Sequence, residues 1–278
     1  AVKPNGKSFA ILACAIVLVI LPANAHASSS DQFSRDGIHV YDDWGISRTR
    51  AAGSNGFLGI TSASHFDPLL AYESLGDNVD LAWQLGQEFT TLYPDINQRA
   101  EKIFTFVRDR VRYTSDSDQF GSAEFAQNAD EVAMTLKSRN LAKGDCEDSS
   151  ILLAVIYKSA GYRSAVALMP GHVATLVYLP EYRKAAHTLK LAGEDGWVWA
   201  EATGDTNRLG WVPTSLVNEG VIAKEIVYSN IENLDTTVSA VEVEFGTRSG
   251  GSSATGTVIF FGSIGFLWLV GGNRRRRL

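Results

Sequence analysis

The sequence predicts an α+β fold in which N-terminal helices pack on an antiparallel sheet. Two features of the hydrophobic pattern support this expectation. Between residues 78 and 159 the apolar residues recur at helical spacings, as on the buried face of a helix. From residue 164 onward they alternate with polar residues, as in a half-buried strand. Because the helical patterns come first and the strand patterns follow as a block, the order differs from a repeated βαβ arrangement.

The helices begin and end at recognisable signals. Pro94-Asp95 opens a helix with a regular apolar stripe, and Asp145 is placed as the N-cap of a later helix that Gly161 ends. The expected helices span residues 78–92, 95–111, 129–141 and 146–159. The stripe expected to be buried on the second of them comprises Ile96, Ala100, Ile103, Val107 and Val111.

Strands follow these helices. Residues 164–168 and 172–179 are expected to form two of them, joined by a turn at Pro170-Gly171. A third alternating stretch covers residues 197–203 and carries Trp197, Trp199, Glu201 and Thr203 on one face.

The N-terminal residues 1–27 are typical of an export signal. Lys3 and Lys7 precede an apolar run, and Ala25-His26-Ala27 provides a small-residue cleavage pattern. The apolar run is shorter than the about 20 residues that a membrane helix needs, which favours a cleaved signal over an anchor. Residues 28–75 are expected to be an irregular segment, and residues 76–245 the main domain.

The C-terminal tail indicates a membrane anchor or a sorting signal. A Gly/Ser linker at 246–256 precedes an apolar stretch at 257–272 and an arginine-rich end at 273–278. Because arginines stay on the cytoplasmic side of a membrane, the domain is expected to be exported, to the periplasm or the cell surface, and held to the membrane by this tail. The order of these segments resembles the GlyGly-CTERM sorting tail. That resemblance implies a rhomboid-type sorting protease as a partner.

Composition excludes some classes of function. The hydrophobic content of 45% is ordinary for a globular protein, and the net charge is −6. Since most of the basic clustering lies in the C-terminal arginines, nucleic acid is not expected as a partner.

Cys146 is the one cysteine left if the export signal is removed, so an internal disulfide is excluded. Its acidic neighbours Asp145, Glu147 and Asp148 argue against a dry core. At a helix start, unsatisfied N–H groups and the helix dipole favour thiolate over thiol. The sequence therefore predicts a nucleophile. A metal site is disfavoured, because zinc needs several Cys or His ligands and hard cations need a cage of oxygens, so no metal or cofactor is expected.

A thiolate needs a proton-transfer partner, and His172 is the histidine that heads a predicted strand. Glu201 lies in an otherwise apolar, aromatic strand, where an unpaired carboxylate would be unfavourable. An imidazole is its natural partner, as in catalytic triads.

These residues resemble the transglutaminase-like superfamily of papain-like thiol enzymes. The motifs are Arg112-Tyr113, Gly144-Asp145-Cys146-Glu147-Asp148, Gly171-His172 and the run from Trp197 to Thr203. The resemblance implies a transglutaminase-like (papain-like) fold, with Cys146 as nucleophile, His172 as base and Glu201 as orienting acid. The family usually has aspartate at the last position, so Asp205 is kept as an alternative acid.

The resemblance implies acyl transfer through a thioester, on a peptide or protein substrate. Hydrolysis, by a peptidase or amidase, is favoured over crosslinking by a transglutaminase. A membrane-tethered binding module that keeps the fold without chemistry is the remaining alternative.

Overall fold

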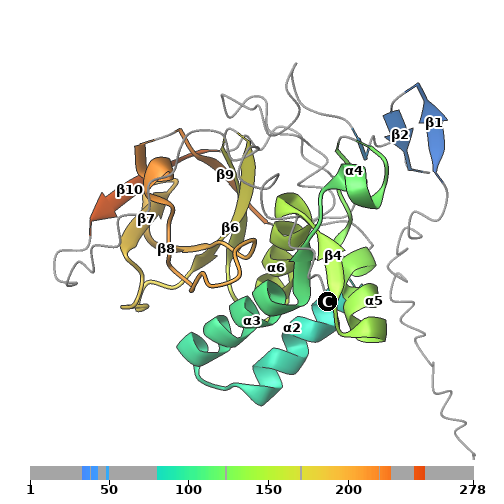
Figure 1. The fold of residues 1–278 in the computed structure, drawn as a ribbon. Helices are drawn as coiled ribbons and strands as arrows, with labels where there is room; N and C mark the ends of the chain where they lie inside the picture. Colours follow the sequence, from blue (N-terminus) through green and yellow to red (C-terminus); the bar gives the residue numbers. More distant parts are fainter. Residues whose placement is uncertain are drawn as a thin grey trace, which may run out of the picture.

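A computed structural model of the chain shows helices packed beside a β-barrel (Figure 1). The residues that the structure describes are 33–37, 39–42, 48–49, 80–122, 124–169, 171–218, 220–226 and 241–247. The expected export signal and the apolar part of the expected tail lie outside these residues. None of the helices in the described ranges combines the length and the apolar character that crossing a membrane requires.

The helices predicted from the sequence are present, which confirms the α+β order. Their bounds are α2 Asp80–Leu92, α3 Ile96–Arg110, α5 Ala129–Arg139 and α6 Cys146–Ser159, and a short α4, Asp116–Gln119, was not predicted. In Figure 1, α6 lies between the barrel and the other helices, and it packs on α2, α3 and α5 as well as on β5 and β6.

Side-chain caps set the helix starts. Asp95 accepts a hydrogen bond from the Gln98 N–H at 2.7 Å, which satisfies one of the free N–H groups of the first turn. Asn128 and Glu131 form a capping box, with bonds of 2.9 and 2.7 Å. The helix that follows ends where Asn140 adopts a left-handed conformation with φ of 58°, a common helix terminator.

The expected stripe on α3 is correct in its middle and wrong at its first residue. Ala100, Ile103 and Val107 are fully buried, whereas Ile96 is 49% exposed. Ile96 is the first helical residue, and the chain has not yet reached the core there. Val111 is buried, but it lies in a strand.

The expected antiparallel sheet is present, and it closes into a barrel. Its strands are β5 Ser164–Met169, β6 His172–Tyr178, β7 His187–Leu191, β8 Glu194–Ala200, β9 Ile222–Glu225 and β10 Val241–Thr247. Around the barrel the order is β10, β7, β8, β6, β5 and β9, and every neighbouring pair is antiparallel. The barrel closes because β10 pairs with both β7 and β9. This strand continues to Thr247, two residues into the segment expected to be a linker.

Successive side chains of the central strands serve two different cores. On β6, Val173 and Val177 join the core shared with α6, while Ala174 and Leu176 join a second core with Trp197 and others. This alternation follows from the period of two along a strand. It places one face of β6 against α6 and the other in the second core.

Two small strand pairs lie outside the barrel. The segment expected to be irregular contains β1, Ser34–Asp36, paired with β2, His39–Tyr41. The second pair is parallel and joins β3, Val111–Tyr113, to β4, Ala142–Gly144. Because β4 ends immediately before Asp145, it carries the chain directly into the start of α6.

Candidate functional site

Cys146 is the first residue of α6, as the sequence predicts, and Asp145 is its N-cap. The Asp145 N–H donates to Oδ2 of Asp148 at 3.3 Å, and the Ser149 N–H donates to the Asp145 carbonyl at 3.2 Å. These bonds fix the first turn of the helix and therefore the position of the thiol.

The acidic neighbours do not keep this region out of the core. Cys146 is 6% exposed, Asp145 is 9% exposed, and Glu147 and Asp148 are fully buried. The expectation that Cys146 lies outside a dry core is therefore wrong. Its premise was that these carboxyl groups are charged, and burial of this extent favours the neutral form.

Gln127 is a partner of the site that sequence reasoning missed. Its backbone N–H donates to Oδ1 of Asp148 at 2.8 Å, and its Nε2 donates to Oδ2 at 2.6 Å. The same Nε2 also lies 3.1 Å from the Lys143 carbonyl. No local signal marks Gln127, because the contact spans 21 residues of sequence.

Five carboxyl groups lie together at this site, namely Asp116, Glu124, Asp145, Glu147 and Asp148, and all but the half-buried Glu124 are buried. Burial, followed by the charges of neighbouring acids, raises the pKa of Asp116 and of Asp148 to about 8, and raises the pKa of Glu124 to about 7. The pKa values of Asp145 and Glu147 are raised as well, chiefly by burial. Oδ1 of Asp145 and Oε1 of Glu147 are both buried without a hydrogen-bond partner among the described residues.

Burial and two acidic neighbours favour the protonated form of the Cys146 thiol. It donates to Oε2 of Glu147 at 3.3 Å. Burial, then the charges of Glu147 and Asp145, raises the pKa of Cys146 well above its ordinary value, while the Val173 N–H acts in the opposite direction. The expectation of a thiolate stabilised by the helix start is therefore wrong for this arrangement, because burial of the thiol, together with the adjacent acids, outweighs the helix end.

His172 and Glu201 form a close pair at the end of the barrel. Nε2 of His172 lies 2.5 Å from Oε2 of Glu201, and their side chains are 12% and 4% exposed. Burial lowers the pKa of His172, but the charge and hydrogen bond of Glu201 outweigh it, so that the pKa is raised. Burial raises the pKa of Glu201, and the bonds from His172 and Thr203 reverse this, so that the pKa is lowered. Charged Glu201 therefore stabilises the imidazolium that forms whenever neutral His172 accepts a proton.

Thr203 is a second partner that sequence reasoning did not assign. Its hydroxyl and its backbone N–H both donate to Oε1 of Glu201, the latter at 3.1 Å. With one carboxylate oxygen on Thr203 and the other on His172, Glu201 has a single orientation. Asp205, the alternative acid, is exposed in the loop beyond β8.

The structure brings Cys146 to the strand that His172 begins. The sulfur faces the backbone N–H of Val173, the next residue along β6. Ser150, one turn further along α6, donates to the Val173 carbonyl at 3.2 Å. Within the described residues the thiol is hydrogen-bonded to Glu147 and not to the imidazole. Nε2 of His172 is engaged by Glu201, which leaves Nδ1 as the ring nitrogen available for proton transfer.

Some of these side chains could also hold a cation. Ligand atoms lie within 4.8 Å of one another in three overlapping groups, namely Asp145 with Cys146 and Glu147, Asp116 with Glu124 and Glu147, and Asp116 with Asp145 and Asp148. Carboxylate oxygens suit hard divalent cations. The sequence disfavoured a metal because the run around Cys146 alone supplies no cage of oxygens. The fold adds Asp116 and Glu124 to that run.

No known family model matches the chain, and it matches no curated protein.

Proposed function

We propose that the protein is a thiol-dependent acyl-transfer enzyme with a transglutaminase-like (papain-like) arrangement. The observation that carries this proposal is the buried pair of His172, at the start of β6, and Glu201, the residue after β8, with Cys146 at the start of the helix packed on β6. The strand predicted to reach Thr203 ends at Ala200, so Glu201 lies just beyond it. A catalytic cysteine at a helix start, a histidine and an orienting acid are the parts such chemistry needs.

Each group then has a defined step. The Cys146 thiol loses its proton to Nδ1 of His172 and attacks an amide carbonyl, with the backbone N–H of Cys146 available to the developing oxyanion. Glu201 stabilises the imidazolium formed. The C–N bond breaks as Nδ1 returns the proton to the departing amine, which leaves a thioester on Cys146. Water attacks the thioester, and His172 accepts the water proton and returns it to the thiolate.

The high pKa of Cys146 means that proton transfer accompanies attack instead of preceding it. At rest the thiol is bonded to Glu147, and it must turn toward His172 when a substrate carbonyl arrives. We favour hydrolysis by a peptidase or amidase over crosslinking by a transglutaminase. The substrate is a peptide or protein met outside the cytoplasm. The C-terminal segment then anchors the enzyme or presents it to a rhomboid-type sorting protease.

The test is incubation of the full chain with a peptide library, with the products weighed by mass spectrometry. Hydrolysis adds one water to the summed products, whereas crosslinking releases one ammonia for each bond formed. Cys146→Ala should abolish either product. If wild type and Cys146→Ala give the same products, the proposed chemistry is wrong.

A second candidate is a binding module without chemistry. The observation in its favour is that the thiol bonds to Glu147 and is kept protonated by burial and by the neighbouring acids. A peptide carrying a thiol-directed electrophile separates the two functions. If the protein is an enzyme, the probe should label Cys146, and His172→Ala should slow the labelling. If it is a binding module, the wild type and His172→Ala should be labelled at the same rate.

A further inference from the structure

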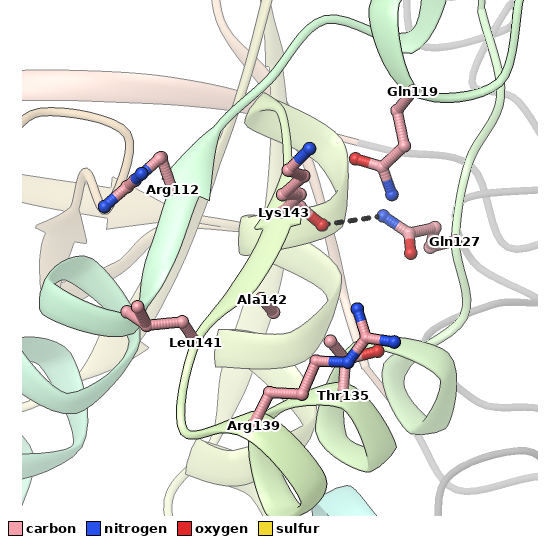
Figure 2. Close-up of a pocket in the computed structure, with 8 residues that line it drawn as sticks. All are labelled: Arg112, Gln119, Gln127, Thr135, Arg139, Leu141, Ala142 and Lys143. Atoms are coloured by element: carbon pink, nitrogen blue, oxygen red, sulfur yellow. Dashed lines mark hydrogen bonds between the residues drawn. The ribbon is translucent and has the colours of Figure 1, made fainter.

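A second region of the described structure, separate from the His172–Glu201 pair, has the features of a ligand site. It is a cavity of about 530 Å³ beside β4, shown in Figure 2. The residues that line it are Arg112, Gln119, Gln127, Thr135, Arg139, Leu141, Ala142 and Lys143.

The charge of this cavity is entirely positive. Arg112, Arg139 and Lys143 line it, and none of its described lining residues is acidic. Within the described part of the chain, none of these cations forms an ion pair with a carboxylate. A chain with a net charge of −6 offers many carboxylates, so this local excess of positive charge is unusual for the molecule.

Two of the cations are held side by side by the fold. Arg112 on β3 and Lys143 on β4 are register partners in the parallel pair, and both are exposed. Like charges on directly neighbouring strand positions repel each other. A bound anion would relieve that repulsion.

The remaining lining residues supply polar and apolar contacts. Nε2 of Gln127 is already engaged by Asp148 and by the Lys143 carbonyl, whereas Oε1 of Gln119 is buried without a hydrogen-bond partner. Leu141 is 47% exposed and adds an apolar wall. The cavity can therefore contact the polar and apolar atoms of a bound molecule as well as its charged groups.

The cationic groups are spread along the cavity. In Figure 2, Lys143 lies near Gln119 and Gln127, Arg139 comes from α5 on the other side of the hollow, and Arg112 lies at the opposite edge, across β4. A single small oxyanion would need donors that converge on one point. An extended segment with several carboxylates fits this spread better.

We propose that this cavity binds an acidic peptide segment. Arg112, Arg139 and Lys143 contact its carboxylates, and Leu141 contacts its apolar atoms. Lys143 precedes Cys146 by three residues, so their Cα atoms lie at most about 11 Å apart. The segment is therefore part of the substrate, a few residues from the bond that reacts. This last assignment rests on the proposed function, whereas the binding itself does not.

The test measures binding without turnover. The full chain carrying Cys146→Ala is titrated into a fluorescein-labelled hexapeptide of glutamates, and into its all-glutamine counterpart, with anisotropy as the readout. The acidic peptide should bind more tightly, and added salt should weaken it. Arg112→Gln, Arg139→Gln and Lys143→Gln should each weaken binding about 2- to 5-fold, the range of an exposed ion pair.

The matched control is Arg183→Gln, which removes an exposed cation that pairs with Glu181 outside the cavity. It should leave the affinity unchanged, and melting curves should show that every variant is folded. Equal affinity for the two peptides, or an equal effect of Arg183→Gln, would overturn the proposal. Displacement of the acidic peptide by equimolar inorganic phosphate would also overturn it, because the site would then bind a simple oxyanion. A protein that binds the acidic peptide but converts no library member would refute the proposed function and leave this site standing.

Discussion

At the scale of single residues, Glu201 is a buried side chain whose position depends on its hydrogen-bond partners. It is almost fully buried, and both of its carboxylate oxygens are occupied, one by His172 and the other by Thr203. A buried carboxylate is stable only when such partners are present. The same bonds fix the orientation of the imidazole, so one residue links stability to the proposed chemistry.

Glu201→Gln should retain the fold and lose activity. The amide keeps the shape of the side chain but cannot stabilise an imidazolium. Loss of the acid in a serine triad lowers turnover by about 10⁴. Since a thiol is the more acidic nucleophile, we expect a loss of about 10 to 10³ here.

The control for Glu201→Gln is Asp205→Asn, which changes an exposed acid in the following loop and should have little effect on turnover of a library peptide. The assignment of Glu201 would fail if Asp205→Asn inactivated the enzyme while Glu201→Gln remained close to wild type.

The thiol should react slowly at neutral pH. Burial and the charges of Glu147 and Asp145 raise the pKa of Cys146, so alkylation by iodoacetamide should have its midpoint above the about 8.5 of a free thiol. Glu147→Gln should shift the midpoint downward, because an amide can donate to the thiolate. A wild-type midpoint below 8.5 would mean that the helix start dominates after all.

Asp116 should destabilise the fold as the pH rises. The pKa of this carboxyl group is raised by burial and by Asp145 and Asp148, from 3.8 to about 8. The folded state therefore binds the proton more tightly than the unfolded state. The stability from this group is present below about pH 4 and is lost as the pH rises through about 8.

Asp116→Asn, which is always neutral, should therefore raise Tm at pH 8 by roughly 2 to 4 °C per kcal/mol gained and raise it by less at pH 5. Melting curves in a chelator, which removes any bound cation, provide the measurement. Asp118→Asn, an exposed neighbour on the same short helix, is the matched control. A lower Tm for Asp116→Asn at both pH values would show that the carboxyl group is needed in its charged form.

At the scale of elements, the contact between α2 and α6 depends on a glycine. Gly86 is buried on α2, and a Cβ there would lie 2.5 Å from the Ile156 carbonyl and would overlap the Ser159 side chain. The two helices can approach this closely only without a side chain at position 86.

Gly86→Ala should therefore destabilise the protein, although alanine favours helix formation by about 1 kcal/mol. Overpacking typically costs about 1 to 3 kcal/mol. We expect a net fall in Tm of a few degrees, measured by thermal melting. Gly220→Ala is the control, because a Cβ there meets no atom within 4 Å. An unchanged or higher Tm for Gly86→Ala would show that α2 can move away at little cost.

The elements also show what the sequence could predict. Local signals were sufficient for α3 and α6, since Asp95 and Asp145 cap them and apolar stripes follow. They were insufficient for β9 and β10, whose pairing is entirely non-local. A strand of four residues such as β9 is too short for its alternation to be distinctive.

Local sequence signals likewise predicted some residues of the candidate site and missed others. A lone carboxylate among tryptophans marked Glu201, and a histidine at the head of a strand marked His172. Gln127 and Asp116 carry no such mark, because they reach the site from distant parts of the chain. Burial of Cys146, followed by the charges of Glu147 and Asp145, also reversed the expected acidity of the thiol, since the extent of burial depends on the fold.

At the scale of the whole molecule, the barrel depends on its last strand. β10 bridges β7 and β9, and Val243 is buried in the second core. Removal of residues 241–278 should expose the edges of β7 and β9 and prevent stable folding.

Removal of residues 250–278 leaves β10 intact. It should keep the fold and the thiol reactivity and should release the protein from membranes, as judged by fractionation and circular dichroism. A shorter variant ending at residue 240 that melts like the one ending at 249 would show that closure is dispensable. A variant ending at 249 that still sediments with membranes would place the anchor elsewhere.

Closure by β10 also imposes an order on biosynthesis. A ribosome delivers the chain from the N-terminus, so α6, Cys146 and the strands β5 to β8 all emerge before the strand that completes the barrel. Until residue 247 emerges, β7 and β9 each present an unpaired edge that another strand could occupy. During that interval the open strand edges make the nascent chain prone to aggregate.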